Sequence, residues 1–349
     1  MVNNPFPLDT TYTIVNQELN LIFDLQKELN SNGTSIVLRL PNSRKSQQFI
    51  FFKLDGKLYA IANQQSGKII DLKGSIDSYT LVQNTWNGEP SQIWYVKNTN
   101  ISEPYYKITN QQNGKIAQAI NHSNDTDNLV SLTSWNDQKM QQWNFTPKKS
   151  IKFPKNIESK PLPFPPDYFS SPYEVLPFQT TPVTVASILL PCILVTDNEW
   201  DDQTKIQHSP YYQFVKEQYW ERIESITLEP GQTNTFQYKT GMKTTDQKSM
   251  MNTIGMSIGA DLGFQFNQTS TKISTQFTST LMVSKSTTSE QLTETTITDS
   301  LTNTRSTKIG ITKYQLVTLY SLLRTDHSFV TEPWKVSDHL TTKDRTIIS

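Results

Sequence analysis

The fold of the N-terminal part is decided by a short stretch that occurs twice. Asn63-Gln64-Gln65-Ser66-Gly67-Lys68-Ile69 returns 47 residues later as Asn110-Gln111-Gln112-Asn113-Gly114-Lys115-Ile116. One further step of 47 residues toward the N-terminus reaches Asn16-Gln17-Glu18. A repeat at a fixed interval is typical of folds built from equivalent units. Three units of roughly 45 residues are each too small to enclose a core of their own, so we expect them to share one.

Each unit also ends in the same way. The three endings are Gln47-Gln48-Phe49, Gln92-Ile93-Trp94 and Gln141-Gln142-Trp143. Within the units the apolar runs are short and rich in β-formers, as in 57–62, and Gly or Asn residues separate them. Short runs bounded by turn residues predict strands, so we expect this part of the chain to be all-β.

Gln-x-Trp endings at this interval resemble the ricin-B-type lectins, which fold as a β-trefoil. The resemblance covers about residues 8–148 and implies sugar binding in shallow pockets, at most one per repeat. In that family an Asp, an aromatic residue, an Asn and the Gln of the motif build the pocket. Amide and carboxylate groups can hydrogen-bond adjacent sugar hydroxyls, and a flat ring can cover the C–H face of the sugar.

The three repeats keep this set to different degrees. The first has Asp24, Asn42 and Gln47 but carries Pro41 and Phe49 where tryptophans are expected. We therefore expect the second repeat to bind best, the third next, and the first not at all. The alternative is that these polar groups only hold the turns, and the Trp of each motif is expected in the core. The second-repeat candidates are Asp71, Trp86, Asn87 and Gln92, and the third-repeat candidates are Gln118 (in place of the Asp), Trp135, Asn136 and Gln141.

The composition changes after the repeats. Eight prolines lie between 154 and 182, and because proline lacks an N–H and favours extended chain, we expect a linker that packs along the second domain. The expected organisation is an all-β chain: a trefoil carbohydrate-binding domain over 1–148, a Pro-rich linker over 149–182, and an elongated β-sheet domain over 183–349. A helix is expected only over Tyr211–Ile223.

One stretch of the second half alternates strictly between apolar and polar residues. Every even position from 254 to 266 is apolar. After a polar turn at 268–272 the pattern resumes on odd positions, with Thr275 and Ser279 interposed on the same face, so the second arm is the weaker of the two. Alternation predicts strands with one apolar face, so we expect an amphipathic hairpin with arms of about 13 and 11 residues. The apolar positions proposed to face lipid are Ile254, Met256, Ile258, Leu262, Phe264, Phe266, Ile273, Phe277, Leu281 and Val283.

Length and polarity decide between a membrane hairpin and an ordinary sheet with one buried face. A tilted membrane strand needs roughly 9–11 residues, so either arm could span a bilayer. Only Asp261 and Lys272 are charged between 254 and 283, and 22 of the 40 residues from 269 to 308 are Ser or Thr. A hairpin joined edge to edge with other copies would satisfy its backbone groups in a barrel. We therefore favour insertion of the hairpin into membrane lipid.

The second half also resembles a known family. The segments 190–197, 204–206, 209–212 and 218–220 are similar to the binary-toxin-type insecticidal proteins of spore-forming bacilli. That family joins a ricin-like trefoil to an aerolysin-type pore-forming domain, which matches the order found here. The resemblance implies a toxin made inside the cell as a parasporal crystal, without a signal peptide, that acts outside it on the insect midgut membrane. It implies a glycan receptor (glycoprotein or glycolipid), a homo-oligomer on activation and, in some members, a second toxin protein.

Other functions are disfavoured by composition. The 32 basic and 32 acidic residues cancel, so no net positive charge favours nucleic acid. The single Cys192 cannot form a disulfide within the chain, and His122, His208, His327 and His339 lack metal-ligand spacing, so no metal or cofactor is expected. We expect no catalytic residue and no enzyme. The competing hypotheses are a lectin or receptor-binding component that forms no pore, and a hydrolase with two close carboxylates in the second half.

Overall fold

The computed structural model describes residues 6–75, 78–100, 103–120, 128–151, 153–155, 157–271 and 273–348. His122 and Lys272 lie outside the described residues. The chain divides into two compact units, and each is described by itself. The first contains 1–154, 190–212 and 268–273, and the second contains 155–189, 213–267 and 274–349. The predicted domain boundaries treat each domain as one continuous stretch, whereas both units are assembled from several.

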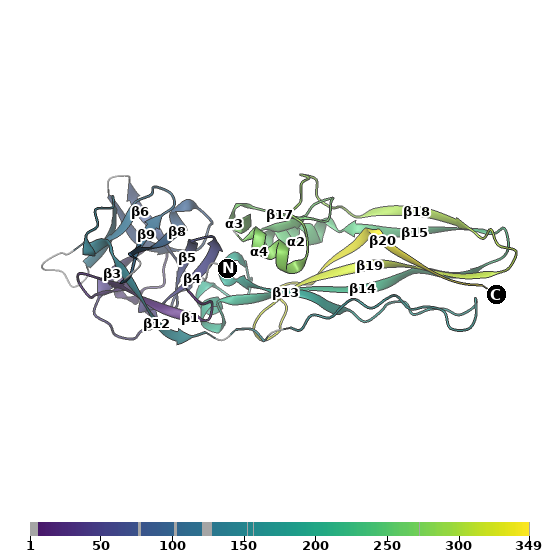
Figure 1. Ribbon diagram of the computed structural model, residues 1–349, viewed down its shortest axis with the longest axis horizontal. Coiled ribbons are helices and arrows are strands. Elements are labelled where there is room, and N and C mark those ends of the chain that lie inside the picture. The colour runs from purple at the N-terminus through teal and green to yellow at the C-terminus, as the bar shows by residue number, and fades with distance from the viewer. Residues whose placement is uncertain are drawn as a thin grey trace. The chain divides into compact units, whose positions relative to one another are not determined.

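Twelve strands form the main body of the first unit (Figure 1). They are β1 (Thr10–Asn16), β2 (Ile22–Leu25), β3 (Thr34–Arg39), β4 (Phe49–Asp55), β5 (Leu58–Asn63), β6 (Ile69–Ser75), β7 (Ser78–Asn84), β8 (Trp94–Asn100), β9 (Glu103–Asn110), β10 (Ile116–Ala119), β11 (Asn128–Thr133) and β12 (Trp143–Ser150).

The pairing of these strands is a β-trefoil. Six of them pair in a closed ring in the order β1-β4-β5-β8-β9-β12 and back to β1. The other six form three hairpins, β2–β3, β6–β7 and β10–β11, which also pair with one another. Each repeat thus contributes two barrel strands flanking one hairpin. The shared all-β core expected from the repeat and the β-trefoil implied by the resemblance to ricin-B-type lectins are both confirmed.

The motif aromatics occupy the shared core, as predicted. Phe49, Trp94 and Trp143 are fully buried. The indole N–H groups of Trp94 and Trp143 donate to the carbonyls of Ile70 and Ala117, each at 2.9 Å. Because both indoles satisfy their only donor inside the core, neither is available to a ligand.

The first unit also contains residues 190–212, which lie well beyond the three repeats in the sequence. This segment includes a 3₁₀ turn (Cys192–Leu194) and the helix α1 (Asp202–His208). The N-cap residue of α1, Asp201, accepts from the Thr204 N–H at 2.7 Å. Cys192 is buried, and burial raises the pKa of its thiol to about 12, so it is an unreactive side chain.

The second unit is built on one antiparallel sheet of six strands, ordered β13-β14-β19-β20-β15-β18. Its members are β13 (Val183–Pro191), β14 (Tyr211–Leu228), β15 (Thr233–Met242), β18 (Thr295–Thr302), β19 (Ile309–Leu323) and β20 (Trp334–Ile348).

The helix expected over Tyr211–Ile223 is wrong, because these residues form part of β14. This strand pairs with β19 from Gln213 opposite Leu323 to Leu228 opposite Ile309. The partner lies about a hundred residues away in sequence, so its backbone hydrogen bonds could not be anticipated from local pattern. Tertiary pairing therefore overrides the weak helical periodicity.

The proline-rich segment packs along the sheet of the second unit. Its carbonyls accept side-chain donors: Trp220 Nε1 donates to Pro163 O at 2.9 Å and the Tyr314 hydroxyl to Pro177 O at 2.7 Å. Leu176 packs into a small cluster with the same Trp220 and Tyr314. Side-chain donors thus hold a segment in which proline has removed many backbone N–H groups.

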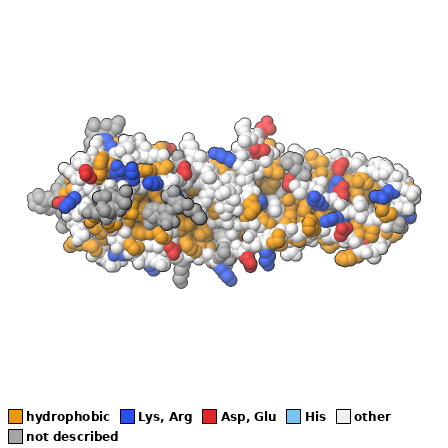
Figure 2. Space-filling model, viewed as in Figure 1, with side chains coloured by type: hydrophobic (Ala, Val, Ile, Leu, Met, Phe, Trp, Pro, Cys, Tyr) orange, Lys and Arg blue, Asp and Glu red, His pale blue; other side chains and the backbone are white. Residues whose placement is uncertain are grey.

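Charged side chains are sparse on the face drawn in Figure 2, where blue and red groups stand mostly singly among white and orange ones. This agrees with the low charged fraction of 18%. Among the described residues, no helix is both long and apolar enough to cross a membrane.

Candidate functional site

The polar residues of the lectin motif form the same network in all three repeats. The side-chain oxygen of Gln47, Gln92 or Gln141 accepts the backbone N–H of the Asn five residues earlier, at 2.8, 2.8 and 2.9 Å. Its amide donates to the backbone carbonyl seven residues earlier, at 2.9, 2.9 and 2.7 Å. All three Gln side chains are fully buried. The motif Gln therefore shapes the loop and is not itself exposed to a sugar.

In the second repeat the predicted residues come together, but most of their hydrogen-bonding capacity is used. Asp71 accepts from the Leu72 N–H at 2.7 Å, from Asn84 Nδ2 at 2.9 Å and from Gln92 Nε2 at 3.1 Å. A carboxylate has about four acceptor positions, so Asp71 can accept one more donor. The side-chain oxygen of the exposed Asn87 accepts the Glu89 N–H at 2.9 Å. Its Nδ2 group is the donor that remains for a ligand.

Two segments of the first unit lie against the loops of this repeat. The Asp202 carboxylate accepts from the Thr85 hydroxyl at 2.9 Å and pairs with Lys68 Nζ at 3.3 Å. A Cβ placed on Gly88 would lie 2.9 Å from the Thr269 Cα. Burial by itself raises the pKa of Asp202, but Lys205, Thr85 and Lys68 together hold that pKa below its ordinary value. The carboxylate is therefore ionised and held at the loop.

Trp86 lies in this loop and is half-buried, so it is less open than a stacking platform for sugar would be. Its indole Nε1 is buried and has no hydrogen-bond partner among the described residues. Asp202 and Thr269 were missed by sequence reasoning, because each lies far from the repeat in the chain.

The third repeat keeps the network with an amide in place of the carboxylate. Gln118 Oε1 accepts from Gln141 Nε2 at 2.9 Å and from the Thr133 hydroxyl at 2.8 Å. Lys107 Nζ lies 4.9 Å from the centroid of the half-buried Trp135, within the range of a cation–π contact. Asn136 is exposed and accepts the Gln138 N–H at 3.2 Å. A sugar stacking on the face of Trp135 that Lys107 covers would displace the ammonium group.

The first repeat, predicted not to bind, contains a cavity of about 210 Å³. Pro41 stands at its wall in the position that Trp86 and Trp135 take in the other repeats. Thr13, which also lines it, corresponds to Lys107, the residue in contact with Trp135. Replacement of an indole by a proline ring therefore accounts for the empty space.

In the second unit, the predicted hairpin over 254–283 is wrong for this structure. Residues 243–294 connect the paired strands β15 and β18. Figure 1 shows the helices and short strands of the second-unit part of this segment beside the ends of those two strands. Leu262 has a φ of 62°, so the first arm turns back on itself. The elements are α2 (Thr244–Ile254), β16 (Met256–Ile258), β17 (Phe264–Phe266), α3 (Gln268–Thr271, in the first unit) and α4 (Ser274–Leu281).

Spacing explains why the second arm is helical. Ile273, Phe277 and Leu281 recur every four residues, which places them on one face of a helix as well as on one face of a strand. Phe277 and Leu281 are fully buried, and the Phe277 ring lies 4.9 Å from that of Phe214 in β14. Phe264 is also buried, with its ring 5.4 Å from Tyr320 in β19. Phe264 and Phe277, both proposed to face lipid, are thus packed against the sheet.

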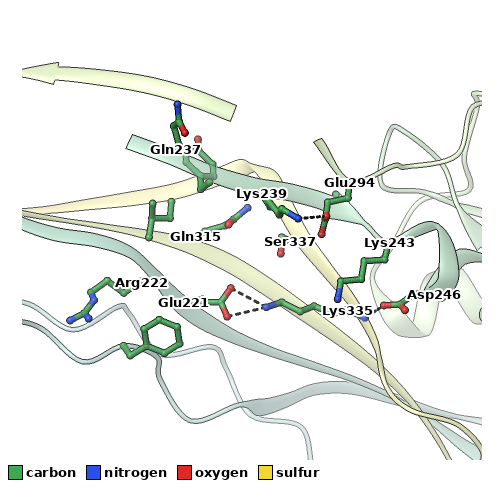
Figure 3. Close-up of a pocket in the computed structure, with 14 residues that line it drawn as sticks. Glu221, Arg222, Gln237, Lys239, Lys243, Asp246, Glu294, Gln315, Lys335 and Ser337 are labelled. Carbon is green, nitrogen blue, oxygen red and sulfur yellow. Dashed lines mark hydrogen bonds and ion pairs between the residues drawn. The ribbon is translucent and has the colours of Figure 1, made fainter. Parts of the chain in front are cut away.

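A pocket of about 400 Å³ lies at the base of this segment (Figure 3). Lys335 Nζ contacts both oxygens of Glu221, at 2.9 and 3.0 Å, and Lys239 Nζ lies 2.9 Å from Glu294. Figure 3 shows these pairs crossing the pocket, with Asp246 of α2 beside Lys335. Burial alone would lower the pKa of Lys335, but Glu221 raises it above its ordinary value. These ion pairs differ from the facing carboxylates that a hydrolase needs.

No group of His, Cys, Asp and Glu side chains in the described ranges could hold a metal ion. In the acidic clusters at 199–202 and 217–221, Asp201, Asp202 and Glu221 form a helix cap or ion pairs within the fold. Asp202 pairs with Lys205 at 3.1 Å, and Asp201 caps α1.

Two family models match different parts of the chain. Residues 183–346 match the family model described as "Insecticidal Crystal Toxin, P42", and residues 6–85 and 90–154 match "Ricin-type beta-trefoil lectin domain-like". The chain is 28% identical over 316 residues to the "Binary larvicide subunit BinA" of Lysinibacillus sphaericus, with 89% of this chain and 83% of the relative covered. It is 28% identical over 212 residues to the "Insecticidal crystal protein Cry35Ab1" of Bacillus thuringiensis, with 55% of each chain covered.

The solved structure of Cry35Ab1 shares the fold. Its TM-score to this chain is 0.82 at 23% identity, and the match covers 98% of this chain and 90% of that one. The "Binary larvicide subunit BinB" of Lysinibacillus sphaericus is 23% identical over 370 residues, covering 96% of this chain and 82% of the relative. The two family matches fall on the trefoil and on the β-sheet domain that the sequence predicts.

Proposed function

The chain belongs to the binary-toxin-type insecticidal crystal proteins, and on that premise we propose that it is a membrane-acting toxin component. In this proposal the trefoil binds a glycan receptor on a glycoprotein or glycolipid, and several copies assemble. The amphipathic hairpin over about 254–283, within the connection 243–294, then inserts into membrane lipid. The matching families describe a toxin and a lectin-like domain, which favours a protein without enzymatic activity.

The observation that carries the proposal is the register of β15 and β18. These strands are already paired, with Thr240 opposite Thr295 at the point where the segment leaves the sheet. If the same one-to-one pairing continued through the segment, Ile258 would face Phe277. Directly opposite residues of an antiparallel pair lie on the same side of the sheet.

This register brings the two apolar patterns together. The even positions of the first arm then share a face with the odd positions of the second: Ile254, Ile258 and Leu262 fall opposite Leu281, Phe277 and Ile273. The other even positions, 256, 260, 264 and 266, fall opposite Ser or Thr, so this face of the extended hairpin is the more apolar one. A slip of one residue would place the two sets on opposite faces. Asp261 falls on the polar face, and the two-residue turn falls at Asn267-Gln268. Continued pairing from β15 and β18 would therefore give an amphipathic hairpin whose more apolar face can contact lipid.

The resting structure allows this extension to be blocked by a disulfide. Ser257 and Gln265 lie opposite each other in the short β16–β17 hairpin, with Ser257 Oγ 3.2 Å from Gln265 Oε1. Antiparallel neighbours have Cα atoms about 4.5–5.5 Å apart, within the range of a disulfide. In the extended hairpin the two residues would be eight positions apart on one strand. Oxidised Ser257→Cys/Gln265→Cys should therefore prevent insertion.

The assay is calcein release from receptor-bearing vesicles. The locked variant is expected to release no more dye than vesicles alone, and dithiothreitol is expected to restore release. The matched control is Thr235→Cys/Ser300→Cys, which links β15 to β18 where the side chains already lie 3.2 Å apart and the pairing is kept. Wild-type release from the oxidised Ser257→Cys/Gln265→Cys variant would refute insertion of this segment.

The second candidate function is a receptor-binding component that works with another toxin protein and forms no pore. The names of the relatives favour it, because BinA and BinB are each described as a subunit of a binary larvicide. A protein that binds glycan arrays and receptor-bearing vesicles but never releases dye would support this alternative. Synthesis as an intracellular crystal inclusion that acts on the midgut is part of the proposal, and fractionation of sporulating cells tests it.

A further inference from the structure

The second repeat differs from its sister repeats in what lies against its loops. Thr269 of α3 approaches Gly88, and Asp202 of α1 approaches Gly67. All four residues belong to the first unit. Ser270, next to Thr269, is 1% exposed. Residues 268–273 begin at the second residue of the proposed hairpin turn, Gln268.

Equivalent positions in the repeats show why residue 88 is a glycine. Ser43, Gly88 and Asp137 follow the motif Asn in the three repeats, and all have positive φ, at 61°, 80° and 63°. Ser and Asp thus adopt this backbone in the first and third repeats. At Gly88 a Cβ would also lie 2.9 Å from Thr269 Cα and 3.1 Å from its Oγ1. The close approach of Thr269, rather than the backbone angle, excludes a side chain here.

The other loop follows the same logic. Asn20, Gly67 and Gly114 are equivalent, with φ of 54°, 72° and 68°. A Cβ on Gly67 would lie 2.0 Å from the Asp202 carbonyl oxygen, whereas one on Gly114 would meet nothing within 4 Å. Both loops of the second repeat therefore pack closely against other segments of the same chain, at Thr269 and at Asp202.

We propose that the second-repeat loops are a latch for residues 268–273, so that the hairpin turn cannot leave while they are engaged. The inference rests on the proposed function. Trp86, Asn87 and Gly88 are consecutive in one loop, and Thr269 packs against Gly88. In this proposal a receptor glycan that binds Trp86 and Asn87 therefore competes with the segment for the loop. A ligand that binds only the released form shifts the population toward it. Receptor binding and release of the membrane segment are thereby coupled.

A cysteine introduced in place of Ser270 reports the latch. Cys192 is buried and supplies no background. In Ser270→Cys, maleimide labelling should be slow, and adding Gly88→Ser should accelerate it at least tenfold because the new side chain collides with Thr269. The matched control, Asp137→Ser, makes the same side chain at the equivalent loop of the third repeat and should leave the rate unchanged. Equal rates in the two variants would overturn the latch.

A second pair tests the α1 contact. In the Ser270→Cys background, Gly67→Ala should accelerate maleimide labelling, whereas Gly114→Ala should not, since both positions share the backbone strain and only Gly67 meets Asp202. Equal labelling rates in Gly67→Ala and Gly114→Ala would show that the contact of α1 with Gly67 does not help to hold the segment.

Dye release separates the latch from the proposed function. From receptor-free phosphatidylcholine vesicles, Gly88→Ser should release calcein at least fivefold faster than Asp137→Ser. Faster labelling with unchanged release would overturn the coupling. If the wild type releases no dye from receptor-bearing vesicles either, the pore proposal fails, while the labelling rates still decide whether the loops hold the segment.

Discussion

Replacing Gln92 with leucine tests whether the lectin-motif glutamine shapes its loop or contacts sugar. Gln92 is fully buried and makes three hydrogen bonds: it accepts the Asn87 N–H at 2.8 Å and donates to Thr85 O at 2.9 Å and Asp71 Oδ2 at 3.1 Å. A neutral hydrogen bond contributes about 1 kcal/mol and one to a charged group about 2 kcal/mol. Gln92→Leu should therefore lower the free energy of unfolding of the first unit by about 4 kcal/mol.

The third repeat supplies the internal comparison. Gln141 makes the same loop contacts, but its amide donates to the side-chain oxygen of Gln118 at 2.9 Å instead of to a carboxylate. The Thr133 hydroxyl also lies 2.8 Å from Gln141 Nε2, and three acceptors therefore share the two amide hydrogens. Gln141→Leu should lower the free energy of unfolding of the first unit by about 3 kcal/mol, which is about 1 kcal/mol less than the effect of Gln92→Leu. The exposed Gln138 is the control, and Gln138→Leu should change stability by less than about 0.5 kcal/mol.

The measurement is hydrogen exchange in urea on peptides that cover β8 and β12, which reports unfolding of the first unit alone. Asn87→Ala should weaken binding on a glycan array with little loss of stability, because the Asn87 side chain is exposed. The reasoning is refuted if Gln92→Leu stays within about 0.5 kcal/mol of the wild type yet abolishes glycan binding. Gln92 would then contact the sugar directly.

Three further predictions concern the core, the cavity and pH. Phe277→Ala removes a fully buried ring beside Phe214 and should cost about 3–5 kcal/mol, seen as faster hydrogen exchange in α4; unchanged exchange would contradict the packing. Pro41→Trp should fill the first-repeat cavity and stabilise the first unit by about 1 kcal/mol in urea, whereas a loss of stability would mean that the space is not equivalent to that of Trp86. Burial alone would lower the pKa of Lys313, but Asp299 and Asp344 raise it above the ordinary 10.5. A raised lysine pKa stabilises below 10.5, and the stabilisation is lost as pH rises through the folded-state value, so the second unit should weaken in that range. Unfolding curves from about pH 7 to about pH 12 should show a smaller decline for Lys313→Met, and identical declines would count against the ion pairs.

The trefoil was predictable because its repeats carry local chemistry. Each Gln bonds to backbone groups five and seven residues away, so the network forms within one repeat and leaves a signature that recurs every 47 residues. The buried motif aromatics follow from the same repetition. Whether the remaining polar groups bind sugar stays a prediction, because hydrogen bonds within the loop and hydrogen bonds to a ligand require the same residue types.

The second unit shows where local pattern is insufficient. β14 pairs with β19, about a hundred residues away, and no local period encodes that partner. The apolar residues at 273, 277 and 281 fit both a strand and a helix, and burial against Phe214 selects the helix in this structure. The alternation that predicts a hairpin remains in the sequence and agrees with the register of β15 and β18.

The repeats of the trefoil, the low charge of both halves and the alternation of the two arms can be read from the amino acids alone, because each depends on residue type and spacing along the chain. That those arms rest as helices and short strands, and that Thr269 and Asp202 lie against the second-repeat loops, becomes visible in the folded chain. Such contacts join residues far apart in sequence and depend on close packing of backbone atoms. At Gly88 and Gly67 the sequence records only the missing side chain, and the neighbour that requires its absence appears when the chain is folded.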